Sequence, residues 1–385
     1  MKIGVYGGTF NPPHIGHVRS ATAAALQLSL DMLIIVPAGI PPHKTMPDGT
    51  PPAQIRFDMT RVAFEGAGNV TVSDIEIKKS GTNYTIDTVM EIKKSNPGAE
   101  LYLLTGTDMY LTLESWRDSK ALLKAVTPAV FSRGLGDIKR ITEFSRLIKK
   151  RYGVSTVTVR NDAVDISSSR IREMLPVREG AGYIADTNYS YIIKHRLYNA
   201  KPDWDWLRAR SYSMLDPERV PHAEGCEHEA IRLAKRWGAD PDDAREAAIL
   251  HDITKKLSPM ENTMILDKHG QKTGSFEHAG EKLLHAKTGA IIARTEFGVS
   301  EEVADAILWH TTGRARMSIL EKIIYLADYI EPERDFEGVE ALRALAYEDL
   351  DRAMVLGLET SISDMKARGI TPDRASFDAL SDLMA

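Results

Sequence analysis

Cysteine is nearly absent from this chain of 385 residues. Cys226 is its one cysteine, which excludes an internal disulfide and any zinc site built from several cysteines. Long apolar runs are absent as well, and none approaches the roughly 18 residues that a membrane-spanning helix needs. The N-terminal residues MKIGVYGG contain no basic segment ahead of an apolar stretch. We therefore expect no signal peptide, and a reduced, cytoplasmic setting fits best.

Aromatic residues are also scarce, at 7% of the chain, while apolar residues make up 43% and charged residues 27%. This profile is typical of a folded globular protein and excludes a disordered or low-complexity chain. The length favours two or three domains.

The net charge of −5 conceals two parts of opposite sign. The residues through Ala200 hold 25 Lys and Arg against 19 Asp and Glu, whereas the remainder holds 24 against 35. Seven of the 11 histidines lie in the second part. A basic part favours anionic ligands and an acidic, histidine-rich part favours cations, although two solvated surfaces of different charge would give the same counts.

In the first part of the chain, β-rich runs alternate with helical patterns. Strands are expected at residues 2–7, 32–38, 70–77, 101–106, 129–133 and 155–160, and helices at 18–28, 54–65, 85–95 and 137–150. Several of the strand runs are continuously apolar, as in a parallel sheet that is buried on both faces. The alternation predicts a doubly wound, Rossmann-like α/β domain over residues 1–200, with ligands bound beyond the carboxyl ends of the strands.

The pattern changes at residues 201–206, KPDWDW, where proline, acidic residues and tryptophans interrupt the helical periodicity. Almost no strand pattern follows. Apolar spacing of about 3.6 residues instead predicts a series of helices, at residues 223–237, 241–256, 276–297, 301–311, 318–330 and 347–368. We therefore expect a second, all-helical domain over residues 205–385, with no internal repeat and no long linker.

The first expected strand runs into the segment GGTFNPPHIGH at residues 7–17. Its glycines lack a Cβ and let the backbone approach a ligand, while His14 and His17 would share one face of the next helix's first turn. Free amides and the positive end of the helix dipole at that turn favour phosphate. A second segment, ISSSRIR at residues 166–172, offers serines that can cap a helix and arginines that can reach phosphate.

These two segments resemble the signatures of the HxGH nucleotidylyltransferases. Five further segments make residues 1–200 similar to nicotinate-nucleotide adenylyltransferase: PAGIPPHK (37–44), RFDM (56–59), NYTIDT (83–88), GTDMYLTLESW (106–116) and FSR (131–133). The resemblance implies transfer of AMP from ATP to nicotinate mononucleotide, which gives deamido-NAD and pyrophosphate. Mg²⁺ would arrive with ATP.

The same resemblance implies roles for individual residues. His14, His17 and Arg172 would act in catalysis, and Tyr84, Thr85 and Trp116 would surround the pyridine ring. Ser169 stands where the family more often has threonine, so the hydroxyl is kept. For Trp116 a position in the apolar core is the alternative. The residues implied to bind nucleotide or phosphate are Gly8, Thr9, Phe10, Lys44, Tyr84, Thr85, Gly106, Asp108, Trp116, Arg133, Ser167, Ser168 and Arg170.

Histidines and aspartates of the helical part are candidates for a metal site. The pair His251 and Asp252 directly follows an apolar run, and Asp328 lies within EKIIYLADYIEP, residues 321–332. That run is so apolar that a buried carboxylate there would need a metal, a cation or a proton. A salt bridge to a nearby Lys or Arg is the alternative for Asp328.

Taken together, this set resembles an HD domain, in which a histidine, a His-Asp pair and a later aspartate bind a divalent metal. The segments LLHAKTGA (283–290), WHTTGRARMS (309–318), YLADYIEPERDF (325–336) and LAYEDLDRAM (345–354) are similar to the YqeK-type HD phosphohydrolases. This resemblance implies symmetrical hydrolysis of diadenosine tetraphosphate to two ADP. One or two transition metals are expected, with Fe or Mn favoured. The implied ligands are His222, His251, Asp252, His285, His310 and Asp328, with Asp252 also catalytic as a bridge between two ions.

Several points stay open from the sequence. His278 lies on the same helical face as His285, so spacing alone does not choose between them. Cys226, one turn from His222, is expected to be an apolar core residue rather than a ligand. Arg314 and Arg316 are candidate polyphosphate contacts, with solvated loop arginines as the alternative.

Two other functions compete with the leading hypothesis. One is an adenylyltransferase for another cofactor precursor, such as phosphopantetheine. The other makes the helical domain a nucleotide-binding regulatory module without catalysis. No motif or basic cluster predicts nucleic-acid binding, and no segment predicts a membrane partner. The preference between nicotinate and nicotinamide mononucleotide and the oligomeric state, a homo-oligomer included, stay open.

Overall fold

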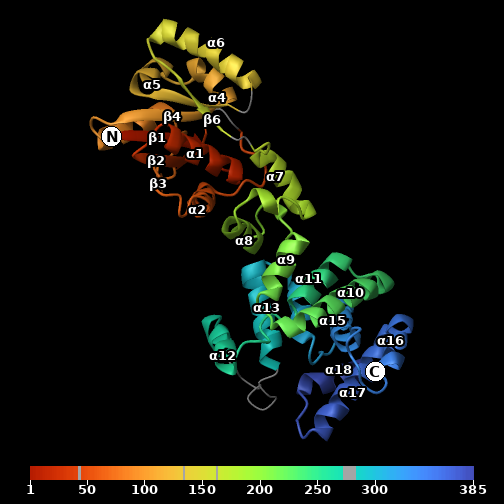
Figure 1. Ribbon diagram of the computed structural model, residues 1–385. Helices are drawn as coiled ribbons and strands as arrows, with labels where there is room; N and C mark the ends of the chain where they lie inside the picture. The colour runs from red at the N-terminus through yellow and green to blue at the C-terminus, as the bar shows by residue number, and fades with distance from the viewer. Residues whose placement is uncertain (42–44, 133–134, 162–163, 272–282) are drawn as a thin grey trace. The chain divides into compact units, whose positions relative to one another are not determined.

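The computed structural model describes residues 1–385 except 42–44, 133–134, 162–163 and 272–282 (Figure 1). The chain forms two compact units, Met1–Lys201 and Pro202–Ala385. Within the described ranges, no helix combines the length and the apolar character that crossing a membrane requires.

The first unit is built on a parallel sheet of six strands in the order β3-β2-β1-β4-β5-β6. The strands are β1 (Lys2–Gly8), β2 (Met32–Pro37), β3 (Val70–Val72), β4 (Glu100–Gly106), β5 (Thr127–Ser132) and β6 (Val157–Arg160). Strand β1 pairs with β2 on one side and with β4 on the other, so that Val5 lies opposite Ile34 and Leu103. The strand order reverses between β1 and β4, and doubly wound sheets bind their ligands at this point.

Two buried apolar clusters belong to this unit, one containing Val5 and Leu103 and the other containing Leu33 and Leu104. Because both faces of the sheet are covered, its strands read as continuous apolar runs. The predicted Rossmann-like α/β fold is confirmed. The helices are α1 (Ile15–Gln27), α2 (Ala53–Ala63), α3 (Thr85–Ser95), α4 (Thr107–Leu111), α5 (Ser119–Ala125), α6 (Leu135–Tyr152), α7 (Ser168–Met174) and α8 (Asp186–Lys194), and short 3-10 turns lie between some of them.

The strand expected at residues 70–77 ends at Val72. Beyond it, the Ser73 hydroxyl accepts a hydrogen bond from the Ile75 amide at 3.3 Å. The Lys78 amide donates to the Asp74 carbonyl at 3.0 Å and closes a turn. The sequence pattern predicted a longer strand because such side-chain-to-backbone bonds compete with the sheet without changing the apolar alternation.

The described residues of the second unit form helices joined by turns and loops, with no strand among them, which confirms the predicted all-helical domain. One apolar cluster runs through it, and α15 lies in that cluster with Ile323, Leu326 and Ala327 buried. The helices are α9 (Trp204–Tyr212), α10 (Val220–Trp237), α11 (Pro241–Leu250), α12 (Pro259–Lys268), α13 (Leu284–Phe297), α14 (Glu301–Trp309), α15 (Ile319–Ile330), α16 (Val339–Glu348), α17 (Leu350–Ala367) and α18 (Arg374–Leu383).

Helix boundaries differ from the expectation where side chains cap a new helix. The KPDWDW segment starts α9, because the Asp203 carboxylate accepts from the amides of Asp205 and Trp206, both at 3.0 Å. The helix expected at residues 347–368 is divided between α16 and α17, and Asp349 caps the second by accepting from the Arg352 amide at 3.0 Å. Part of the helix expected at 276–297 lies outside the described residues.

Helix α11 ends at Leu250, although the apolar spacing predicted a helix through residue 256. The next residue, His251, turns its ring back and places Nδ1 2.7 Å from the Ala248 carbonyl oxygen. Residues 251–256 then form turns. The His-Asp pair therefore follows a helix end rather than lying inside a helix.

Candidate active sites

The first site lies where β1 ends and α1 begins. Gly8 closes the strand, and a Cβ on it would lie 3.0 Å from the Phe10 ring, so a larger residue would push this buried ring aside. His14 is the N-cap of α1 and His17 is the third residue of that helix, and their ring centroids are 3.7 Å apart. The His14 amide donates to His17 Nδ1 at 3.2 Å. Both imidazoles thus stand together at a helix start, as their spacing predicts.

The segment at residues 166–172 meets this loop. Ser167 caps α7 by accepting from the Arg170 amide at 3.2 Å, as the sequence predicts for its serines. The Ser168 hydroxyl donates to the Pro12 carbonyl at 2.8 Å, and Arg172 Nη1 donates to the Asn11 carbonyl at 2.7 Å. The two segments that carry the resemblance therefore form one site, in which Arg172 supports the loop.

Two further residues hold the same loop, and sequence reasoning did not assign them this role. Arg56, only 2% exposed, donates from Nη1 to the Thr9 carbonyl at 2.8 Å and from Nη2 to the Gly39 carbonyl at 3.0 Å. The Tyr198 hydroxyl donates to Asn11 Oδ1 at 2.8 Å, and burial raises the pKa of this phenol, so it stays protonated. An arginine on the apolar face of α2 could have drawn attention to Arg56, but no motif marks Tyr198.

The residues expected around the pyridine ring lie at the edge of one apolar cluster. Tyr84 and Trp116 are both half-buried against it, and Arg117 stacks over the Tyr84 ring at 4.5 Å. Trp116 Nε1 donates to Thr112 Oγ1 at 3.1 Å. Trp116 is thus partly packed against the core and partly open, which leaves a face available to a ligand. Thr85 begins α3 directly after Tyr84.

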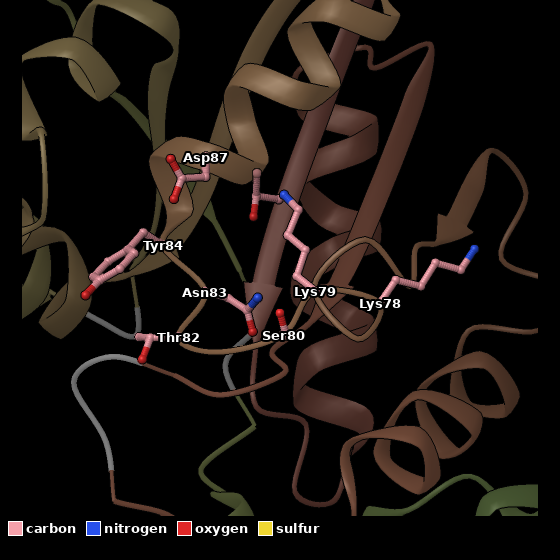
Figure 2. A pocket seen from close by; sticks show the side chains of 8 residues that line it. Lys78, Lys79, Ser80, Thr82, Asn83, Tyr84 and Asp87 are labelled. Atoms are coloured by element: carbon pink, nitrogen blue, oxygen red, sulfur yellow. The ribbon is translucent and has the colours of Figure 1, made fainter.

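A pocket of about 480 Å³ opens beside this segment (Figure 2). Asn83, 7% exposed, holds its wall because its Oδ1 accepts from the Ile40 amide at 2.9 Å. This hydrogen bond therefore ties the wall of the pocket to the loop after β2. It is lined by Lys78, Lys79, Ser80, Thr82, Asn83, Tyr84, Asp87 and Thr88.

The remaining candidates of the first unit are Gly106, Asp108, Arg170, Lys44 and Arg133. Gly106 ends β4 and precedes α4, and Asp108 on that helix is exposed, with Oδ1 3.6 Å from Arg140 Nη1. The Arg170 guanidinium is exposed and lies 3.2 Å from the Glu173 carboxylate. Lys44 and Arg133 lie outside the described residues.

The second site brings together all six residues that the resemblance implies as metal ligands. His222 comes from α10, His285 from α13 and Asp328 from α15. The other three, His251, Asp252 and His310, directly follow the ends of α11 and α14. All six are buried except Asp328, which is half-buried.

The Asp252 carboxylate lies between two groups of imidazoles. Its Oδ2 is 3.4 Å from His251 Nε2 and 3.8 Å from His222 Nε2. Its Oδ1 is 3.3 Å from His285 Nε2 and 3.7 Å from His310 Nε2. The two oxygens thus face different imidazole nitrogens within one buried cluster of histidines and aspartates.

Backbone carbonyls orient two of these imidazoles. His251 Nδ1 lies 2.7 Å from the Ala248 carbonyl and His310 Nδ1 lies 2.6 Å from the Ile307 carbonyl. Because a carbonyl only accepts, both Nδ1 atoms carry the proton and leave Nε2 free to act as a metal ligand. His251 Nε2 is buried and lies 3.4 Å from Asp252 Oδ2. Burial lowers the pKa of His285 to about 4, so its neutral imidazole is also available. This donor set fits a divalent transition metal.

Cationic side chains contact the carboxylates of both Asp252 and Asp328. Arg219 contacts Asp252, and Lys255 Nζ lies 3.1 Å from Asp252 Oδ1. Arg334 Nη2 donates to Asp328 Oδ1 at 2.7 Å, so the salt bridge considered from the sequence is present alongside the histidines. Burial would raise the pKa of Asp252, but the neighbouring imidazoles outweigh it and hold this pKa well below its usual range. The carboxylate is therefore ionised and ready for a cation.

Three sequence expectations concern residues around this cluster. Cys226 is 1% exposed, as predicted, yet its Sγ lies 3.5 Å from His222 Nε2 and within 4.8 Å of the donor atoms of His251 and Asp328. Arg314 Nη2 lies 2.6 Å from the buried carboxylate of Glu321. His278 lies outside the described residues, and Arg316 donates its backbone amide to Asp382 at 2.7 Å.

Comparisons with known proteins match each unit separately. The profile of the cytidylyltransferase-like family matches residues 5–174, and that of the HD domain matches residues 219–333. A curated relative from Carboxydothermus hydrogenoformans, named "Probable nicotinate-nucleotide adenylyltransferase", is 37% identical over 201 residues, which cover 51% of this chain and 98% of that protein.

Relatives of the second unit match equally well. A "Bis(5'-nucleosyl)-tetraphosphatase, symmetrical" from Halalkalibacterium halodurans is 45% identical over 163 residues, which cover 41% of this chain and 86% of that protein. A solved structure from Clostridium acetobutylicum, described as a "predicted HD superfamily hydrolase involved in NAD metabolism", is 36% identical, covers 47% of this chain and 96% of its own, and has a TM-score of 0.46. The chain therefore belongs to the nicotinate-nucleotide adenylyltransferase family and, in the same polypeptide, to the HD-domain family of symmetrical bis(5'-nucleosyl)-tetraphosphatases.

Proposed function

We propose that this chain is a bifunctional enzyme. Its first unit transfers AMP from ATP to nicotinate mononucleotide, and its second unit hydrolyses diadenosine tetraphosphate symmetrically to two ADP. The observation that carries the proposal is that each family match coincides with an assembled site. His14, His17 and the segment at 166–172 meet in one unit, and six metal-ligand residues meet in the other.

In the first unit, a phosphate oxygen of the mononucleotide attacks the α-phosphorus of ATP, and the bond to the β-phosphate breaks to release pyrophosphate. No covalent enzyme intermediate is needed. The two imidazoles and the amides at the start of α1 would neutralise the charge that develops on the departing pyrophosphate. Mg²⁺ bound to ATP would add positive charge there. The remaining contribution is positioning, for which Arg56, Arg172 and Tyr198 keep the loop rigid.

Trp116→Ala is expected to raise the KM for nicotinate mononucleotide several-fold while the KM for ATP changes little. Stacking of a pyridine ring on the indole contributes roughly 0.5–1.5 kcal/mol beyond the buried area. Steady-state kinetics with each substrate varied in turn measures this effect, with Trp116→Phe as the variant that keeps a ring. Equal changes for both substrates, or only a lower Tm, would favour a role in the core.

In the second unit, His222, His251, Asp252 and Asp328 would hold one divalent ion, and His285 and His310 would share Asp252 with a second ion. Imidazole mixed with carboxylate favours Fe or Mn. Such ions supply Lewis acidity at the phosphoryl group. Arg219, Lys255 and Arg334 now pair with the carboxylates of Asp252 and Asp328, and a bound metal would supply the balancing positive charge in their place. Arg219, Lys255 and Arg334 would then bind the polyphosphate chain.

One preparation of the full chain tests both activities. Incubation with ATP and nicotinate mononucleotide should give deamido-NAD, and incubation with diadenosine tetraphosphate should give ADP alone. Metal analysis of the same sample should find one or two ions in each chain. Phosphopantetheine consumed in place of nicotinate mononucleotide would favour the first alternative. Tightly held metal without ADP formation would favour the regulatory module, and no observation so far supports either.

A further inference from the structure

Glu331 is a buried carboxylate that the proposed chemistry does not use. It follows α15, three residues after Asp328, and is 1% exposed. Its Oε1 lies 3.0 Å from His222 Nδ1, and its Oε2 accepts from the Glu333 amide at 2.7 Å. Burying a carboxylate is costly unless its oxygens have partners of this kind. Glu331 is thus fixed by the Glu333 amide on one side and presents its other oxygen to the His222 ring.

The contact determines which nitrogen of His222 faces the site. An ionised carboxylate only accepts, so Nδ1 carries a proton and donates it to Glu331. The other nitrogen, Nε2, lies 3.1 Å from Asp328 Oδ1 and 3.8 Å from Asp252 Oδ2. A divalent ion near Asp328 and Asp252 would bind at Nε2, while the hydrogen bond to Glu331 keeps the proton on Nδ1. Backbone carbonyls have the same effect on two neighbouring histidines, and for His222 this role falls to a side chain.

Gly225 supplies a second, independent observation. It lies one turn after His222 on α10, and a Cβ there would come within 2.7 Å of Glu331 Oε2 and 3.3 Å of Pro332 Cδ. The backbone at Gly225 is helical, so its conformation does not require glycine. Glycine inside a helix lowers the stability of that helix relative to alanine. The presence of glycine here is explained by the Glu331 carboxylate, which occupies the space that a Cβ at residue 225 would need.

We propose that Glu331, accommodated by Gly225, is the positioning residue that fixes the ring and the protonated nitrogen of His222 for a divalent transition metal. The inference rests on the proposed metal-dependent function of this site. Replacing a partner of this kind typically lowers metal affinity about 10–100-fold. Glu331 itself touches neither the metal nor the substrate, so its effect should appear first in the metal affinity.

Titration of the metal-free full chain with Mn²⁺ alone tests this role. Glu331→Gln should raise the Kd for Mn²⁺ by about 10–100-fold, because the NH2 group that replaces one carboxylate oxygen cannot accept, and His222 Nδ1 and the Glu333 amide bond to different oxygens. Gly225→Ala should also weaken binding by displacing the carboxylate. Glu227→Gln is the matched control, since Glu227 is a buried carboxylate of the same helix that pairs with Arg208 at 2.7 Å. The Kd of Glu227→Gln for Mn²⁺ should stay at the wild-type value.

The outcomes separate this inference from the function on which it rests. If wild-type protein binds no divalent metal, the proposed function of the second unit fails. If wild-type protein binds Mn²⁺ tightly and Glu331→Gln binds it equally well, only the role of Glu331 is overturned. Glu331→Gln is nearly isosteric, so it keeps the test decisive should Gly225→Ala fold poorly. Equal losses in Glu331→Gln and Glu227→Gln would point to general destabilisation and would also overturn the inference.

Discussion

Asp252→Ala is expected to abolish ADP formation from diadenosine tetraphosphate and to remove bound metal, while adenylyl transfer continues at the wild-type rate. The physical reason is that Asp252 turns one carboxylate oxygen toward His251 and the other toward His285, so its loss would remove a ligand from both proposed metal positions at once. Adenylyl transfer needs only the Mg²⁺ that comes with ATP. Elemental analysis of the purified variant and product analysis with each substrate measure the three quantities.

Related variants sharpen this result. Asp252→Asn keeps the shape of the side chain but loses the charge that balances Arg219 and Lys255, so it should also lose metal. His285→Ala should lower ADP formation only slightly if one metal ion suffices for hydrolysis. It should abolish ADP formation, as Asp252→Ala does, if hydrolysis requires two ions. His278→Ala should have little effect in either case. An Asp252→Ala protein that keeps metal and still forms ADP would refute the assignment of this site.

The six candidate metal ligands could be singled out from the sequence because their signals are local. Asp328 lies in an apolar run where a charge has to be compensated, and the His-Asp pair directly follows an apolar helix. A buried histidine or aspartate also has few possible roles, because its polar side chain needs a metal, a cation or a hydrogen-bond partner. Sequence periodicity indicated six strands and most of the helices for the same reason, since each signal lies within about a dozen residues.

The contacts that hold those ligands in place could not be predicted. Glu331 meets His222 across 109 residues of sequence, and Tyr198 meets Asn11 across 187 residues. Neither glutamate nor tyrosine at such a position differs from an ordinary surface residue until the fold brings its partner near. The end of α11 was missed for a related reason. The His251 ring bonds back to its own helix, and apolar spacing carries no sign of that bond.

His17→Ala is expected to lower kcat for adenylyl transfer by about 10²–10³-fold, the typical loss when one preorganised contact to developing charge is removed. The His17 ring stands in the first turn of α1, packed edge-on against Phe10 with centroids 5.0 Å apart, so it is held in place before substrate binds. Hydrolysis of diadenosine tetraphosphate should be unchanged, because its residues lie in the other unit. Single-turnover assays of both reactions on the same protein measure the two rates.

His195→Ala provides the matched control for this prediction. His195 is an exposed histidine of the same unit whose ring lies against Tyr191 with centroids 4.5 Å apart, and it is not among the residues that form the loop at 7–17. Its removal should leave both rates at the wild-type level. A normal kcat in His17→Ala would show that the helix start does not stabilise the departing pyrophosphate. Equal losses in His17→Ala and His195→Ala would mean that the variants act through the stability of the unit rather than through charge at its phosphate site.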